Sequence, residues 1–153
     1  MNPLRLSLLL TAGLAAGLAA CATASGPANT PAPSQLSACD GGPHCVSSLS
    51  ADEDHKVAAL VLKAPADKAW AAAIEAVRGT ERTTIVQGDA HYLHAEVVSP
   101  WHFYTDDLEL MLRDNGRIEV RSSSRIGYYD FGVNRKRIEA LREALATKGV
   151  VSR

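Results

Sequence analysis

The sequence lacks an excess of charge of either sign, with 16 Lys and Arg residues against 17 Asp and Glu residues and a formal net charge of -1. A nucleic-acid-binding domain is usually strongly basic, so no nucleic-acid partner is expected. The chain also lacks a Gly-x-Ser-x-Gly nucleophile elbow, a phosphate-binding loop and a dinucleotide-binding fingerprint. No motif therefore indicates a reaction or a cofactor.

What is present is an ordinary globular composition, with 46% hydrophobic and 22% charged residues in a chain of 153. This mixture argues against wholesale disorder, and the length allows one domain with a sizeable core. The hydrophobic residues are unevenly distributed, because residues 6–20 consist almost entirely of Leu, Ala and Gly. Since Arg5 is the only charged residue before Asp40, residues 1–20 have the pattern of a secretory signal peptide.

The signal-like segment ends in Leu-Ala-Ala-Cys at residues 18–21. This string resembles the bacterial lipobox, in which the Cys becomes the first mature residue and is lipidated. The resemblance implies a lipoprotein with palmitate and other acyl chains on Cys21, and several chains anchor a protein stably where one is marginal. Because Ala22 rather than Asp follows the Cys, it also implies the outer membrane, with the chain facing the periplasm. The alternative is an ordinary signal peptide cleaved after Ala20.

Residues 21–37 are expected to hold the lipidated Cys and a flexible linker. They carry no charged and no aromatic residue, so they can bury little apolar area to offset the entropy of ordering. The folded part is then residues 38–153, expected as a single domain.

Two further cysteines, Cys39 and Cys45, remain if Cys21 carries the anchor. The segment between them includes Gly-Gly-Pro, which lets the chain turn back, and an exported protein lies in a compartment that permits disulfides. We favour a Cys39–Cys45 disulfide. The alternative is a metal site that also uses His44, but zinc sites usually need four ligands and no second Cys pair is present. No metal is therefore expected.

The folded part is expected to contain two helices and one sheet. Apolar residues at helical spacing predict helices over residues 65–78 and 133–148. Residues 57–62 form a short apolar run typical of a strand. Four further strand-like runs are separated by turn residues, and they span residues 82–87, 91–98, 105–113 and 117–124.

The order strand, helix, four strands, helix predicts an α+β domain. Its sheet would be an antiparallel meander of four to five strands with both helices on one face. In the last hairpin, a two-residue turn would mix the apolar and polar faces. A three-residue loop that ends in a left-handed Gly116 keeps the faces apart and predicts four pairs: Leu112 with Ile118, Leu110 with Val120, Glu109 with Arg121, and Asp107 with Ser123.

Several strings in the folded part resemble a known family. The longest are Arg-Ser-Ser-Ser-Arg-Ile-Gly at residues 121–127 and Asp-Phe-Gly-Val-Asn-Arg at residues 130–135. With shorter strings upstream, they make residues 39–147 similar to the domain of unknown function 1499 family of bacterial exported proteins. The family implies no established reaction, but it marks eight residues as a candidate polar cluster: Asp106, Asp107, Glu109, Arg121, Arg125, Asp130, Asn134 and Arg135.

The candidate polar cluster has two interpretations. It is an anion-binding or catalytic surface, since Arg side chains bind carboxylate or phosphate bidentately. Alternatively, and this we favour, it is a salt-bridge network that fixes strand register and ties the loop at residues 127–134 to the sheet. In that case Asp130 or Asn134 caps the last helix.

Aromatic residues gather in two expected loops. Trp, Phe and Tyr lie at residues 101–104, and two Tyr lie at residues 128–129. We favour the interpretation that they pack as core at the edge of the sheet. If they are exposed instead, they form a patch for a partner or a lipid surface.

The sequence favours a non-catalytic, lipid-anchored binding or interaction module of the cell envelope, whose partner is an envelope protein or a small anionic ligand. The first alternative is a small hydrolase that uses Asp107 or Glu109 near Arg121. Its base would be His94 or His102, although no motif positions a nucleophile. The second alternative is a carrier of lipid or another envelope component, by analogy with helix-grip folds.

Overall fold

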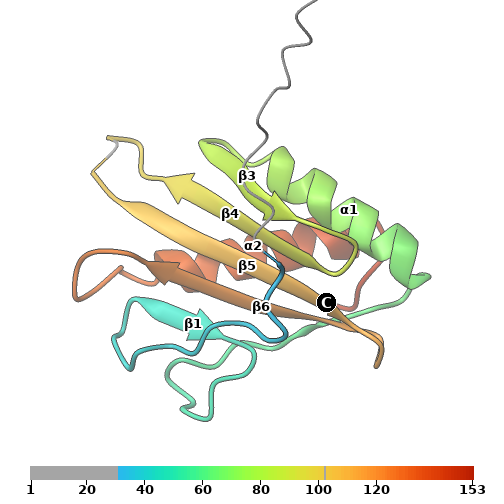
Figure 1. Ribbon diagram of the computed structural model, residues 1–153, viewed down its shortest axis with the longest axis horizontal. Helices are drawn as coiled ribbons and strands as arrows, with labels where there is room; N and C mark the ends of the chain where they lie inside the picture. Colours follow the sequence, from blue (N-terminus) through green and yellow to red (C-terminus); the bar gives the residue numbers. More distant parts are fainter. Residues whose placement is uncertain (1–30, 102) are drawn as a thin grey trace, which may run out of the picture. The chain divides into compact units, whose positions relative to one another are not determined.

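The computed structural model describes residues 31–101 and 103–153. The expected signal peptide at residues 1–20, the lipidation site Cys21, the first part of the linker and His102 lie outside the described residues. No helix in the described part is long and apolar enough to cross a membrane. The fold is α+β, with two helices against one face of an antiparallel sheet, as the sequence predicts (Figure 1).

The two helices lie where the hydrophobic pattern predicts them. Helix α1 spans Ala66–Arg78, and Pro65 precedes its first turn, where a proline costs no hydrogen bond. Its buried residues recur at three- and four-residue spacing and so form one stripe: Ala69, Trp70, Ala73 and Val77. Helix α2 spans Val133–Thr147 and buries a similar stripe: Asn134, Ile138, Leu141 and Leu145.

The sheet has the strand order β1-β6-β5-β4-β3, and β2 also pairs with β6. The strands are β1 (Cys45–Ser47), β2 (Leu60–Val61), β3 (Thr83–Gly88), β4 (Tyr92–Val98), β5 (Thr105–Arg113) and β6 (Arg117–Ser124). The last four coincide, within one residue at each end, with the runs that the turn residues delimit.

The first two strands differ from the expectation. The strand predicted over residues 57–62 is reduced to β2, because the carbonyl groups of Ala58 and Ala59 accept hydrogen bonds from Arg142 of α2 rather than from a strand. Strand β1 has no counterpart in the sequence prediction, since three residues are too few to show an alternation.

The predicted hairpin between β5 and β6 is confirmed. Leu112 pairs with Ile118, and Glu109 pairs with Arg121. Gly116 has a φ of +76°, the left-handed conformation that the three-residue loop requires. The alternation of apolar residues is enough to select this register, because a slip of one residue would turn the apolar set toward solvent.

The hydrophobic core lies between the sheet and the two helices. Its central residues in β4, β5 and β6 are Leu93, Leu110, Ile118 and Val120, and each of them is at most 1% exposed. Ile138 and Leu145 of α2 and Val77 of α1 pack against them. Since neighbouring residues of a strand face opposite sides, the charged residues between these apolar ones lie on the outer face of the sheet.

The segment before β1, drawn in blue in Figure 1, covers part of this outer face. Leu36, in the segment expected to be a linker, is buried against Tyr92 and Met111. Arg113 donates a hydrogen bond of 3.0 Å to the carbonyl of Ser34. A disulfide between Cys39 and Cys45 joins the segment to β1. Residues 32–36 therefore contact the end of the sheet where β4 begins.

We expect Gly116→Ala to lower the free energy of unfolding by about 1 kcal/mol, because an L-residue is strained in the left-handed conformation. No atom lies within 4 Å of the added Cβ, so the loss would come from the backbone alone. The matched control is Gly79→Ala, since Gly79 has an ordinary φ of -78° and should lose no stability. Urea unfolding followed by circular dichroism measures both variants. An equal loss in both would contradict the loop conformation.

Candidate functional site

Four of the eight residues of the candidate polar cluster lie together on the outer face of the sheet: Asp107, Glu109, Arg121 and Arg125. Arg121 Nη1 donates a hydrogen bond of 2.7 Å to Glu109 Oε2. Arg125 Nη2 donates to Asp107 Oδ1 at 2.8 Å and to Glu96 Oε1 at 2.6 Å. Each arginine is thus paired with a carboxylate of a neighbouring strand.

Asp107 lies at the centre of this outer-face network. Its Oδ1 is 2.7 Å from Nε2 of His94, in addition to the contacts with Arg125. Burial alone would raise the pKa of Asp107, but the hydrogen bonds from Arg125 and His94 outweigh it and hold the pKa below its ordinary value. The same pairing raises the pKa of Arg125. Asp107 and Arg125 therefore form a charged pair at neutral pH.

Tyr92 extends the outer-face network beneath the segment before β1. Its hydroxyl group donates a hydrogen bond of 2.8 Å to Glu109 Oε1. Burial, together with this carboxylate, raises the pKa of Tyr92 above its ordinary value. Both oxygens of Glu109 are therefore occupied, one by Tyr92 and one by Arg121.

Three more residues of the cluster lie where α2 meets the sheet: Asp106, Asp130 and Asn134. The eighth, Arg135, lies on α2 and contacts the segment between β1 and β2. Asn134 is fully buried. Its amide oxygen accepts hydrogen bonds from Ser122 Oγ and from Arg137. Its amide nitrogen lies 3.0 Å from Ser124 Oγ, 2.9 Å from the carbonyl of His44 and 2.9 Å from Asp130 Oδ2. One side chain thus connects the segment before β1, strand β6, the loop before α2 and α2 itself.

We call the contacts between α2 and the inner face of the sheet the inner network. Arg137 belongs to it, and the sequence prediction missed this residue. It pairs with Asp106 across 2.5 Å, and both side chains are largely buried. A signal for it exists in the sequence. Asp106 shares its strand face with Leu108, so it points toward the helices and needs a buried cation there. Arg137 lies four residues before Leu141, on the buried stripe of α2.

Asp130 holds the start of α2. Its two carboxylate oxygens accept hydrogen bonds of 2.8 Å from the backbone N–H groups of Gly132 and Asn134. Burial would raise the pKa of Asp130, but these N–H groups outweigh it and lower the pKa. Phe131, which lies between Asp130 and Gly132, has a φ of 57°, a left-handed conformation that is uncommon for a residue with a side chain.

The expectation that the aromatic residues pack as core at the sheet edge is wrong. Six aromatic residues, each at least 52% exposed, lie in two loops beyond the strand ends: Trp101, Phe103, Tyr104, Tyr128, Tyr129 and Phe131. We call residues 99–101 and 103–104 the first aromatic loop and residues 125–132 the second. The chain has two Trp, four Tyr and two Phe, and only Trp70 and Tyr92 among them are buried. The two helices cover the sheet itself, and aliphatic side chains fill the space between helices and sheet. The aromatic residues lie in loops beyond this core and are therefore exposed.

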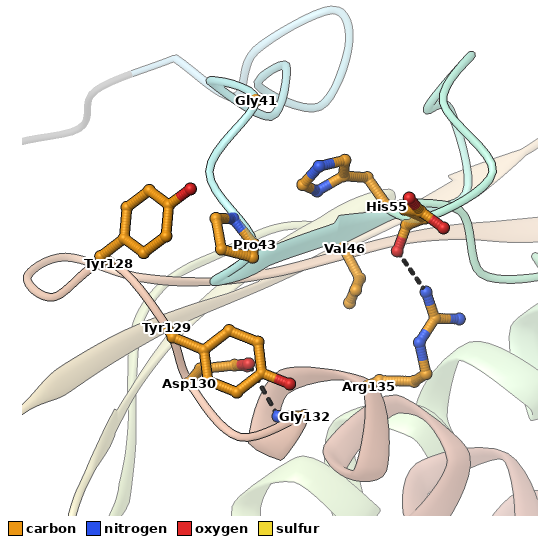
Figure 2. Close-up of a pocket in the computed structure, with 10 residues that line it drawn as sticks. Gly41, Pro43, Val46, His55, Tyr128, Tyr129, Asp130, Gly132 and Arg135 are labelled. Atoms are coloured by element: carbon orange, nitrogen blue, oxygen red, sulfur yellow. Dashed lines mark hydrogen bonds between the residues drawn. The ribbon is translucent and has the colours of Figure 1, made fainter.

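A cleft of about 490 Å³ separates the second aromatic loop from the segment around the disulfide (Figure 2). Tyr128 and Pro43 lie on one side of it, and His55 and Arg135 lie on the other. Arg135 donates hydrogen bonds of 2.7 and 2.8 Å to the carbonyls of Lys56 and Asp54. The cleft is therefore lined by aromatic and polar groups, and its arginine is held by the backbone.

A second, smaller hollow of about 230 Å³ lies between the two aromatic loops and shares Tyr129 and Asp130 with the cleft. Within residues 31–101 and 103–153, no group of three or more His, Cys, Asp or Glu side chains is placed to hold a metal ion. The arrangement offers aromatic surfaces beside two hollows, next to a charged network whose members contact one another.

Comparison with known protein families matches residues 35–145 to a family described as "Protein of unknown function (DUF1499)". The matched range contains the whole candidate polar cluster, the disulfide and both aromatic loops. No similar curated protein and no similar solved structure was found.

We expect the stability contributed by Asp107 to depend on pH. Because its pKa is lower in the folded chain, this contribution is fully present above the unfolded value of about 3.9 and is lost as the pH falls through the folded pKa. Asp107→Asn should therefore cost on the order of 1 kcal/mol at pH 6 and progressively less below pH 4. Urea unfolding at several pH values measures this, with the exposed Asp114→Asn as the control. A loss that does not change with pH would contradict the pairing.

Proposed function

The chain belongs to the protein of unknown function (DUF1499) family, and we propose that it is a non-catalytic binding module of the cell envelope, anchored by lipids on Cys21. The proposed binding surface consists of the two aromatic loops and the hollows beside them. The observation that carries the proposal is the exposure of six of the eight aromatic residues in these two loops. Exposed apolar surface that gathers in one place is typical of interaction sites.

The second aromatic loop is fixed in position, although its rings are exposed. The carboxylate of Asp130 accepts hydrogen bonds from the backbone N–H groups of Gly132 and Asn134, which both follow Phe131, and the side-chain amide of Asn134 also donates to it. Phe131 is 79% exposed, so burial of its side chain does not offset the strained backbone at this residue. Strained backbone that surrounding contacts enforce is common at binding sites. A rigid loop also loses less entropy when it binds a ligand or partner.

The position of the aromatic loops supports a ligand or partner away from the anchoring membrane. The described chain begins beside Tyr92, at the first residue of β4, where Ala32 packs on Tyr92 and Met111. The first aromatic loop follows Val98, at the other end of β4, roughly 20 Å away at the usual rise per residue. A tether that enters at one end of the sheet leaves the opposite end, with its aromatic rings, to face the periplasm.

A hydrolase is the second candidate, and the contact between His94 and Asp107 is the observation that favours it. However, the nearest candidate nucleophile on the same face is Ser123 of β6, and β5 lies between it and His94. Two strand spacings separate the backbones of Ser123 and His94 by about 10 Å, and Nε2 of His94 contacts Asp107 rather than the Ser123 hydroxyl. The hydroxyl of Ser123 is 3.5 Å from the carbonyl of Ser124. This geometry supports a binding role over hydrolysis.

A lipid carrier has less support. A protein of that kind encloses an apolar cavity for its cargo. Between the sheet and the helices, aliphatic side chains such as Leu110, Ile118 and Leu145 are fully buried and pack against one another.

We expect native mass spectrometry of the full chain, extracted from membranes in mild detergent, to show a bound small molecule or partner. Tyr128→Ser with Tyr129→Ser should remove it, whereas Asp107→Asn should keep it, because the outer-face network is structural. Cys21→Ser should move the chain from the membrane fraction to the soluble fraction. Loss of the bound species in Asp107→Asn alone, or turnover of an ester or amide substrate that this variant abolishes, would favour the hydrolase.

A further inference from the structure

The smaller hollow between the aromatic loops has walls of aromatic and aliphatic side chains. Tyr104 comes from the first aromatic loop, and Tyr129 and Phe131 come from the second. Ile126 and Val133 complete the apolar lining. Both loops thus contribute to one enclosure of about 230 Å³, which is large enough for a small organic group.

The rings around the hollow are set at defined angles. The rings of Tyr129 and Phe131 are 5.2 Å apart between centroids and stand at 78° to each other. Tyr104 is positioned through Ser99, whose hydroxyl accepts a hydrogen bond of 3.1 Å from the Tyr104 backbone N–H. The backbone N–H of Ser99 donates in turn to the carbonyl of Tyr104 at 2.9 Å. The two rings therefore meet edge to face, and both side chains line the hollow.

The negative charge at the hollow comes from Asp130. The charged residues that line the hollow are Asp106 and Asp130, and among the described residues no Lys or Arg lines it. Asp106 is paired with Arg137, and the oxygens of Asp130 accept hydrogen bonds from Gly132 and Asn134. The hydrogen-bonded N–H groups lower the pKa of Asp130, so it is ionised at neutral pH. Asp130 therefore supplies negative potential, while both of its oxygens already accept hydrogen bonds.

Such a site suits a cation that has no N–H group to donate. A quaternary ammonium is attracted to aromatic faces and carries a diffuse positive charge. A lysine ammonium is strongly hydrated and needs hydrogen-bond acceptors in place of water. The oxygens of Asp130 already accept hydrogen bonds from other donors. An anion would face the ionised carboxylate of Asp130. This chemistry differs from the small anionic ligand that the arginines suggest, because the structure pairs Arg121, Arg125 and Arg137 with carboxylates.

We propose that the hollow formed by Tyr104, Tyr129 and Phe131 binds a methylated ammonium group of the choline type. The proposal rests on the proposed function, since it names the ligand class of the same binding surface. Choline as a free compound and choline as a lipid head group present the same trimethylammonium to the rings.

Isothermal titration calorimetry of the full chain in detergent tests the proposal with two probes of the same shape. Choline carries the charge, and 3,3-dimethylbutan-1-ol replaces the charged nitrogen with carbon. We expect choline to bind with a Kd in the millimolar range and the neutral alcohol to bind roughly tenfold more weakly. Equal binding of both probes would show a merely hydrophobic hollow and would overturn the proposal. The absence of choline binding would also overturn it.

Variants locate the site and separate ring faces from apolar volume. Phe131→Leu keeps an apolar side chain but removes a ring, so we expect choline to bind about 3- to 10-fold more weakly. Leu49→Ala is the control, because Leu49 is also apolar and exposed but lies outside both aromatic loops and does not line the hollow. Tyr129→Leu serves as a second variant if Phe131→Leu does not fold. An equal loss in Leu49→Ala would place the binding elsewhere and contradict the proposal.

Vesicles distinguish the two sources of the group. The unanchored Cys21→Ser chain is sedimented with vesicles of phosphatidylcholine or of phosphatidylglycerol. Choline binding together with sedimentation on phosphatidylcholine alone supports a lipid head group, and choline binding without sedimentation supports a free compound. If native mass spectrometry shows a bound species that excess choline does not displace, the ammonium proposal is wrong while the proposed function stands.

Discussion

The buried amide of Asn134 is the interaction on which the aromatic end of the domain depends. It has no exposed surface, and its two polar atoms contact β6, α2, the carbonyl of His44 and the carboxylate of Asp130. A buried amide is costly unless its hydrogen bonds are made, so the elements that supply its partners are held in one arrangement. Asp130 transmits this arrangement to the second aromatic loop, because its carboxylate binds the backbone N–H groups of Gly132 and Asn134, directly after Phe131.

Successive side chains of a β-strand point to opposite faces, so residues 121–125 make contacts on both faces of the sheet. In β6, Arg121 points outward to Glu109, and Arg125, just after the strand, pairs outward with Asp107. Ser122 and Ser124 point inward and bind Asn134. The string therefore joins neighbouring strands on the outer face and fixes α2 on the inner one. Arg121 and Arg125, which first suggest a reactive surface, are paired with carboxylates of the domain. The aromatic residues of the two loops are exposed instead.

Much of the fold could be predicted from the sequence, because it depends on patterns that are local. The helical stripes and the alternation of leucines in β5 determine α1, α2 and the register of the last hairpin. Strand β1 could not be predicted, since only pairing with a distant strand defines three residues as a strand. The candidate residues were found through family strings, but their division into outer and inner networks depends on tertiary contacts. Exposure of the aromatic loops was not predictable, because loop residues show no periodicity from which burial can be inferred.

The most direct test of this account is hydrogen exchange in Asn134→Ala, compared with Ile138→Val as a control that loosens the core but leaves the network intact. Loss of the amide removes one of the three hydrogen bonds that hold the Asp130 carboxylate, so the backbone N–H of Gly132, which Asp130 binds, should exchange about 10- to 100-fold faster than in the control. The amides that pair β5 with β6 should exchange as in the control. Unchanged exchange at Gly132, or the same increase in β5 and β6, would contradict the claim that Asn134 holds the aromatic loop.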